Sequence, residues 1–177
     1  MILRQTEIPG AFVVEPELIA DERGFFSRIF DVDEFSARGL ETEFQQWSVS
    51  YNQRPGTLRG MHFQRDPHAE AKLVRCTRGS LYDVVVDLRR DSPMFRRWAA
   101  VELSAENRLA LYIPKGLAHG FQTLEPGTEV VYAISERFEP SAAGGVRWDD
   151  PAFGIDWPQA DQRVMSKKDR SWPDFTP

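Results

Sequence analysis

Turn-forming residues recur along this chain at intervals too short for long helices. Its 177 residues include 12 glycines and 12 prolines, scattered rather than clustered, and the segments between them are short. Many of these segments are rich in valine, isoleucine and aromatic residues, and several alternate apolar and polar positions, which is typical of strands. About ten such segments predict an all-β sandwich or small barrel of the jelly-roll kind.

The clearest predicted strand is residues 81–88 (LYDVVVDL), with large apolar side chains on one face and Asp83 and Asp87 on the other. From Pro140 onward the sequence is typical of loops, with a short helical or irregular tail. No linker or repeat divides the chain, which we interpret as a single domain over residues 1–177. We expect a short helix at residues 31–38 and further strands at residues 11–16, 18–20, 24–30, 43–51, 57–64, 72–77, 98–103, 109–113, 118–124 and 129–135.

Polar side chains that could bind a ligand or take part in catalysis are concentrated in residues 57–87, between apolar strand patterns. This stretch contains Arg59, His62, Lys72 and Arg75. Such groups on neighbouring strands are what a binding site in the mouth of a β-barrel requires. Arg59 and Lys72 lie inside strand patterns, where an unpaired charge would be costly, so we predict that they bind an anion or a polarised carbonyl oxygen.

Composition and charge exclude several classes of protein. The net charge of −5 argues against a general nucleic-acid-binding protein, although a local arginine cluster could still bind a small anion. The one cysteine, Cys76, cannot form an intramolecular disulfide. No segment is apolar enough to span a bilayer, and the first residues lack the apolar run of a signal peptide. We therefore expect a cytoplasmic protein that does not associate with membranes.

Three histidines are available for chemistry. His62 and His119 lie in strand-like segments and could be a base, a ligand or hydrogen-bonded core residues, whereas His68 lies in a polar loop and reads as a surface residue. Two isolated histidines leave a metal short of ligands, so we expect no metal. Tyr132 could pack in the core or supply a proton. Asp169, in SKKDR, reads as a surface residue from its surroundings alone.

Eight long motifs follow one another over nearly the whole chain. They are RGFF (23–26), LRGMHFQ (58–64), KLVRCTRG (72–79), DVVVDLRRDSP (83–93), VELSAEN (101–107), IPKGLAHGF (113–121), GGVRWDDPAFGIDWP (144–158) and SKKD (166–169). In these motifs and their order the chain resembles dTDP-4-dehydrorhamnose 3,5-epimerases. The resemblance implies a cupin-type jelly-roll sandwich or barrel with a few short helices, a homodimer, and no metal or other cofactor.

The resemblance also implies a reaction, namely removal of a proton next to the 4-keto group of a nucleotide-linked hexose and its return on the other face. Such catalysis needs a base, an electrophile for the enolate oxygen and an acid on the opposite face. By motif, His62 resembles the base and Asp169 the carboxylate that orients it. Lys72 would stabilise the enolate, His119 would contact the sugar, and Tyr132 would be the acid.

Several further positions resemble the family's substrate-binding residues, and some of them depart from its pattern. Arg23, Arg59 and Lys168 would hold the diphosphate, as their charge allows. We also expect substrate contacts from Arg28, Gln46 and Phe138. The departures lie mainly toward the nucleotide: Arg28 replaces a glutamate, Gln46-Trp47-Ser48 replaces Gln-x-Asn, Ala143 replaces a glutamate before Gly-Gly, and Phe138 replaces a tyrosine.

These departures leave alternatives open at the level of sequence. The substrate could carry a base other than thymine, and inversion could be confined to C3 or to C5. A 3,4-ketoisomerase would need the same enolisation but would relocate the carbonyl. A non-catalytic sugar-nucleotide-binding module is the remaining alternative, although His62 and Tyr132 are both retained.

Overall fold

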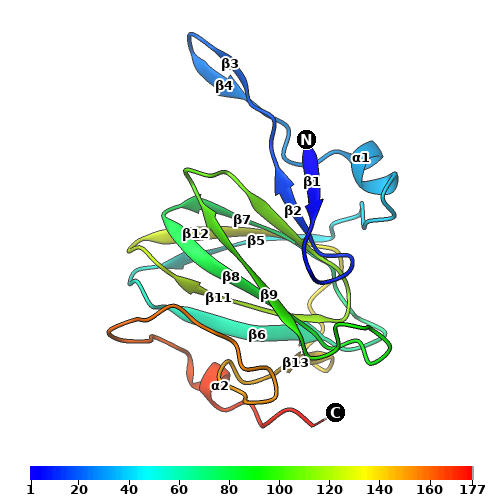
Figure 1. Cartoon of the computed structure of the whole chain (residues 1–177), viewed down its shortest axis with the longest axis vertical. Helices are drawn as coiled ribbons and strands as arrows, with labels where there is room; N and C mark the ends of the chain where they lie inside the picture. The colour runs from blue at the N-terminus through cyan, green and yellow to red at the C-terminus, as the bar shows by residue number, and fades with distance from the viewer. Residues whose placement is uncertain (177) are drawn as a thin grey trace.

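The computed structural model describes residues 1–176, and two antiparallel sheets packed face to face form its body (Figure 1). The first sheet has the spatial order β1 (Ile2–Gln5), β2 (Phe12–Glu15), β10 (Ala110–Ile113), β7 (Lys72–Arg78), β12 (Thr128–Ile134) and β5 (Gln46–Asn52). The second sheet has the order β13 (Ala143–Gly145), β6 (Leu58–Gln64), β11 (Leu117–Thr123), β8 (Ser80–Asp87) and β9 (Trp98–Ser104). The predicted all-β sandwich is confirmed.

The main hydrophobic core lies between the two sheets. Val74 and Val130 point inward from the first sheet and meet Val85 and Phe121 of the second. Because side chains alternate across a strand, the neighbours of Val85 point the other way and help to form a separate cluster on the outer face of the second sheet. Both predicted faces of residues 81–88 are therefore packed, one in the main core and the other in the outer cluster.

The chain beyond Pro140 covers that outer face. Val146, Phe153 and Trp157 are buried against it, so the loop-like sequence there has a packing role. The same region contains the short strand β13, which we did not predict, and the short helix α2 (Lys167–Arg170). No helix within residues 1–176 is long and apolar enough to cross a membrane.

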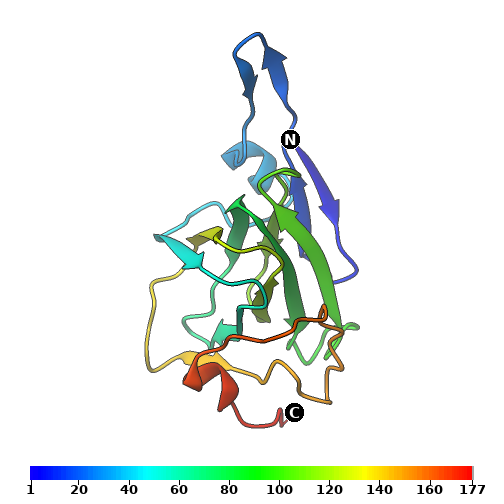
Figure 2. The same ribbon diagram turned by 90° about the vertical axis from the view of Figure 1, so that its left-hand side faces the viewer.

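A two-stranded hairpin projects from the body at the end opposite α2 (Figures 1 and 2). It consists of β3 (Ile19–Asp21) and β4 (Gly24–Phe26). The strand predicted over residues 24–30 is therefore too long. The chain leaves β4 and returns to the body, where the Phe30 ring packs edge-on against Phe35 of α1 (Val32–Ser36), with centroids 4.8 Å apart.

Candidate active site

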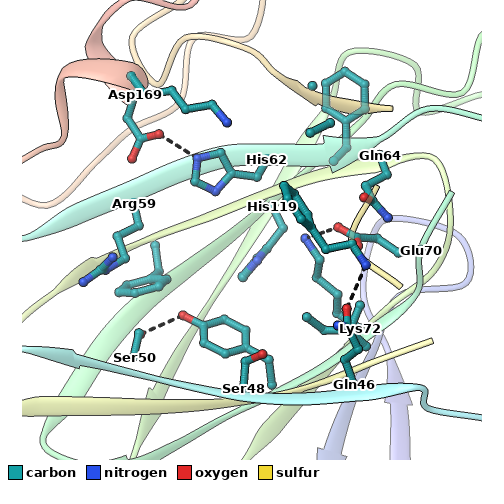
Figure 3. Close-up of a pocket in the computed structure, with 18 of the residues that line it drawn as sticks. Gln46, Ser48, Ser50, Arg59, His62, Gln64, Glu70, Lys72, His119 and Asp169 are labelled. Carbon is teal, nitrogen blue, oxygen red and sulfur yellow. Dashed lines mark hydrogen bonds and ion pairs between the residues drawn. The ribbon is translucent and has the colours of Figure 1, made fainter. Parts of the chain in front are cut away.

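A cavity of about 510 Å³ lies between the sheets, and all the predicted site residues except Arg23 and Arg28 line it. One wall is formed by β6 and β11 of the second sheet and the facing wall by β5, β7 and β12 of the first. Figure 3 shows polar side chains converging on the cavity from both walls. Residues far apart in the sequence, such as Gln46 of β5 and Asp169 of α2, are brought together here.

His62 and Asp169 form a hydrogen-bonded pair on the β6 wall. The distance from His62 Nε2 to Asp169 Oδ1 is 2.7 Å, and the Asp169 side chain is buried while that of His62 is 42% exposed. α2 holds the carboxylate in place, because the Asp169 amide donates to Ser166 Oγ at the start of the helix. With Nε2 bound to Asp169, Nδ1 is the imidazole nitrogen left to accept a proton.

The local environment keeps Asp169 ionised. Burial acts to raise the pKa of this carboxyl, but the hydrogen bond and charge of His62, together with the bond to Ser166, outweigh burial and hold the pKa below its ordinary value. An ionised Asp169 accepts a hydrogen bond from the Nε2–H group of His62, and it would stabilise an imidazolium if Nδ1 took a proton. Asp169, which read as a surface residue from its neighbours alone, is buried at the site as the resemblance implied.

The lowered pKa of Asp169 predicts a pH-dependent loss of stability. A carboxyl with a lower pKa in the folded than in the unfolded state stabilises the fold above the unfolded pKa, and this contribution is lost as the pH falls through the folded pKa. We therefore expect the free energy of unfolding to fall more steeply below about pH 4 in the wild type than in Asp169→Asn. Urea unfolding across this range measures the difference. The exposed control Asp161→Asn should follow the wild-type curve, and a parallel Asp169→Asn curve would contradict the prediction.

An irregularity in β6 lets Arg59 and His62 face the same cavity. Three residues apart, they would point to opposite faces of a regular strand. The pairing with β11 shifts between them, because His62 lies opposite His119 while Arg59 lies opposite Phe121. Gly60 permits this with a φ of +141°, and a Cβ there would lie 2.5 Å from the Gly120 Cα.

Arg59 is held in place from the opposite sheet. Its Nε donates to Asn52 Oδ1 over 2.8 Å, and Asn52 is itself buried, with its amide nitrogen donating to the Thr128 carbonyl. This support fixes the guanidinium of an exposed arginine at the cavity, where its remaining donors can face an anion.

Tyr132 stands on the wall that faces His62. It lies on β12 opposite Ser48 of β5, and its hydroxyl is 3.0 Å from Ser50 Oγ. Burial raises the pKa of the Tyr132 phenol above its ordinary value, and the hydrogen bond with Ser50 opposes this shift only in part. The phenol therefore holds its proton at neutral pH, as an acid must before it acts.

His119 belongs to a second buried pair that sequence reasoning did not predict. Its Nε2 lies 2.6 Å from Asp83 Oδ1, and the side chains are 5% and 0% exposed. The other oxygen of Asp83 is buried without a hydrogen-bond partner among the described residues. The sequence does contain one signal for this pair: Asp83 lies inside an apolar strand pattern, where a buried charge requires a partner. Asp83 thus fixes the orientation of the imidazole beside the cavity.

Gln46 and Phe138 meet at the rim of the cavity. The Phe138 amide donates to Gln46 Oε1 over 2.8 Å, so Gln46 braces the segment that presents the exposed Phe138 ring. Of the positions that depart from the family pattern, Ser48, Ala143 and Phe138 line the cavity, whereas Trp47 is exposed on the outer face of β5.

Of the remaining predicted cations, Lys168 lies at the cavity, Arg23 in the hairpin, and Arg28 in the segment between the hairpin and α1. Lys168 of α2 lines the cavity, with Nζ 5.4 Å from the centroid of the Trp172 ring. Arg23 pairs with Asp21 at the turn of the hairpin, and Arg28 pairs with Asp31 over 3.1 Å. Neither arginine lines the cavity of its own chain, so their roles as substrate contacts stay predictions. Within residues 1–176 no group of three or more His, Cys, Asp or Glu side chains is placed to share a metal ion.

The fold and the cavity define a cupin-type jelly roll, and comparison with solved structures agrees. The dTDP-4-dehydrorhamnose 3,5-epimerase of Elizabethkingia anophelis is 37% identical and superposes with a TM-score of 0.96, covering 99% of this chain and 96% of that one. The Bacillus anthracis enzyme of the same name, solved with TDP and PPi bound, is 41% identical with a TM-score of 0.93, covering 98% and 99%.

Sequence comparison gives the family. Residues 5–176 match the family model described as dTDP-4-dehydrorhamnose 3,5-epimerase. The Methanothermobacter thermautotrophicus protein of that name is 45% identical over 170 residues, which are 95% of this chain and 91% of the relative. This chain belongs to the dTDP-4-dehydrorhamnose 3,5-epimerase family, as the resemblance of its motifs implied.

Proposed function

We propose that this chain inverts C3 and C5 of dTDP-4-dehydro-6-deoxyglucose, a nucleotide-diphospho-4-keto-6-deoxyhexose, in deoxysugar biosynthesis. The observation that carries the proposal is the placement of the His62–Asp169 pair and the protonated Tyr132 on facing walls of one cavity. A sugar ring between these walls would offer one face to a base and the other to an acid. The names and bound ligands of the family's solved members support the substrate class.

The chemistry follows from the acidity of protons next to a ketone. His62 Nδ1 takes the proton from the carbon beside C4, and the electron pair moves through the new C–C double bond to O4. Lys72, which lines the cavity, donates a hydrogen bond to the enolate oxygen. Tyr132 then gives its proton to the opposite face of the same carbon, and the enolate collapses to the ketone. Solvent resets both residues, and no electron is gained or lost, so the proposal requires no redox cofactor.

Arg59 and Lys168 are the proposed contacts for the diphosphate. Both line the cavity, and neither has a carboxylate within ion-pair distance in residues 1–176. Phosphate oxygens accept hydrogen bonds from such groups, and the relative solved with TDP and PPi supports an anionic ligand in this family. His119, oriented by Asp83, is the proposed sugar contact.

Proton exchange in D₂O tests the proposal. We expect the protein to convert dTDP-4-dehydro-6-deoxyglucose to its epimer, with one deuterium entering each inverted carbon, as followed by NMR and mass spectrometry. A relocated carbonyl in the product would identify a 3,4-ketoisomerase instead. Binding of the nucleotide sugar without any exchange would identify a non-catalytic module and overturn the proposal.

A second candidate function differs only in substrate range, and the cavity wall is the observation that favours it. Ser48, Ala143 and Phe138 offer a hydroxyl, a methyl group and an unsubstituted ring where the family pattern has larger polar groups. These side chains could favour another base or restrict inversion to C3 or C5. The same exchange assay with CDP-, GDP- and UDP-linked 4-keto-6-deoxyhexoses ranks the bases, and the position of deuterium identifies the inverted carbon.

We further propose that the protein is a homodimer. Trp47, Val49 and Tyr51 on the outer face of edge strand β5 are 60%, 63% and 52% exposed, an unusual concentration of apolar surface. The projecting hairpin exposes more aromatic surface and carries Arg23, which cannot serve its own cavity in this arrangement. A second copy would cover these surfaces, and its hairpin and the segment that follows it could bring Arg23 and Arg28 to the neighbouring cavity.

Sedimentation equilibrium measures the assembly directly. We expect twice the monomer mass for the wild type and a shift toward monomer for Trp47→Glu combined with Val49→Glu, because two buried charges would oppose the interface. Glu102→Gln, an exposed change on β9, is the control. A monomeric wild type at micromolar concentration would contradict the dimer. Cytoplasmic localisation stays a prediction from the sequence.

A further inference from the structure

An ion pair inside the cavity involves a carboxylate to which neither the motifs nor the proposed mechanism gives a role. Lys72 Nζ lies 2.9 Å from Glu70 Oε1, and each side chain is only 10% exposed. Both residues line the cavity, and Figure 3 shows the two groups facing each other at the end of β7. Charged side chains with so little exposure require partners, and each meets that need through the other.

The backbone holds Glu70 in this position. The next residue, Ala71, is buried; its amide donates to Ser135 Oγ over 2.8 Å, and its carbonyl accepts from the Ser135 amide over 3.0 Å. The loop before it is fixed as well, because Gln64 Nε2 donates to the His68 carbonyl over 3.0 Å. The Glu70 carboxylate is therefore presented by a segment tied down on both sides.

Two other carboxylates in and beside the cavity are each hydrogen-bonded to a histidine. Asp169 is bonded to His62 and Asp83 to His119. Glu70 is thus the acidic side chain available to the ammonium group of Lys72. A lysine side chain has several rotatable bonds and loses much rotamer freedom when fixed, so a partner that fixes it before substrate arrives lowers the entropic cost of using it.

We propose that Glu70 is a positioning residue for the reaction, acting through Lys72. Its carboxylate accepts a hydrogen bond from one of the three ammonium N–H groups of Lys72, which leaves the other two to point into the cavity, toward the place of the enolate oxygen. This inference rests on the proposed function, in which Lys72 stabilises the enolate. A donor that is already oriented stabilises the negative charge that develops on this oxygen in the transition state. Loss of Glu70 should therefore lower kcat more than it raises KM.

A double-mutant cycle tests the inference. We expect Glu70→Gln, which keeps the shape and removes the charge, to lower kcat about tenfold with KM changed less than about twofold. Lys72→Met should lower kcat further, and adding Glu70→Gln to it should have no additional effect, because the two residues act as a unit. Glu106→Gln, the same change at an exposed turn, is the control, and melting temperatures check that each variant is folded.

Two results would overturn the inference while leaving the epimerase function intact. One is a kcat of Glu70→Gln equal to that of the wild type; the other is an equal loss from Glu70→Gln with and without Lys72, which would mean that Glu70 acts independently. A wild type that exchanges no proton is instead a failure of the proposed function. In that case the NMR signal of the Lys72 ammonium group tests the positioning role without any measurement of activity. We expect this resonance to be protected from solvent exchange in the wild type and lost in Glu70→Gln. An unchanged resonance in Glu70→Gln would refute the positioning role.

Discussion

Replacing His62 with alanine is expected to lower the rate of proton removal from the substrate by about 10²–10⁴-fold, the usual contribution of a general base. The imidazole is placed for this role by its 2.7 Å bond to Asp169, which leaves Nδ1 to accept the proton. Alanine cannot accept a proton, and no other basic side chain forms an ion pair with Asp169 within residues 1–176. Loss of the C–H signal of the substrate in D₂O measures the rate.

His68→Ala is the matched control, because it deletes the same side chain outside the cavity. Calorimetric titration with dTDP should show that His62→Ala still binds the nucleotide, since the proposed diphosphate contacts are other residues. Exchange in His62→Ala at more than about a tenth of the wild-type rate would contradict the role of His62 as the base.

Replacing Tyr132 with phenylalanine is expected to separate proton removal from inversion. His62 remains able to take the proton, but the facing wall has lost its donor, so the enolate is reprotonated mainly from the face it left. We expect formation of the epimer to fall by about 10²–10⁴-fold while deuterium still enters the recovered substrate. NMR distinguishes the deuterated substrate from its epimer in one sample.

The substitution removes only an oxygen, and the ring of Tyr132 can still pack beside His119, 6.5 Å away between centroids. Tyr82→Phe makes the same change on the outer face of the second sheet and should retain full activity. A Tyr132→Phe protein that forms the epimer as fast as the wild type would exclude the phenol as the acid.

The strands could be predicted where their own residues encode the alternation. In β8 the period of two separates Val84 and Val86 from Val85, and the structure places them on opposite faces. β13 consists of Ala143, Gly144 and Gly145 and has no such pattern; it forms because the edge of β6 offers unpaired backbone groups. The elements missed are those whose conformation depends on tertiary pairing.

Which residues lie together at the cavity was predictable through the motifs but not from the neighbours of each residue in the sequence. Asp169 lies in a run of charged residues that resembles a solvated surface, and only the packing of α2 against β6 buries it beside His62. Asp83, in a strand, and Glu70, in the loop before β7, were missed because a local sequence pattern does not show which cation a carboxylate will meet. The family resemblance provided pairings that propensity and periodicity do not contain.

The central claim is that the sugar ring lies between His62 and Tyr132, and a crystal structure of the wild type with an inert analogue tests it most directly. The dTDP-linked 6-deoxyhexose with a hydroxyl at C4 cannot enolise and should bind without reacting. We predict that His62 Nδ1 and Tyr132 Oη approach one ring carbon from opposite faces, each within about 3–3.5 Å. Both groups on the same face of the ring, or a sugar bound outside the cavity, would contradict the account.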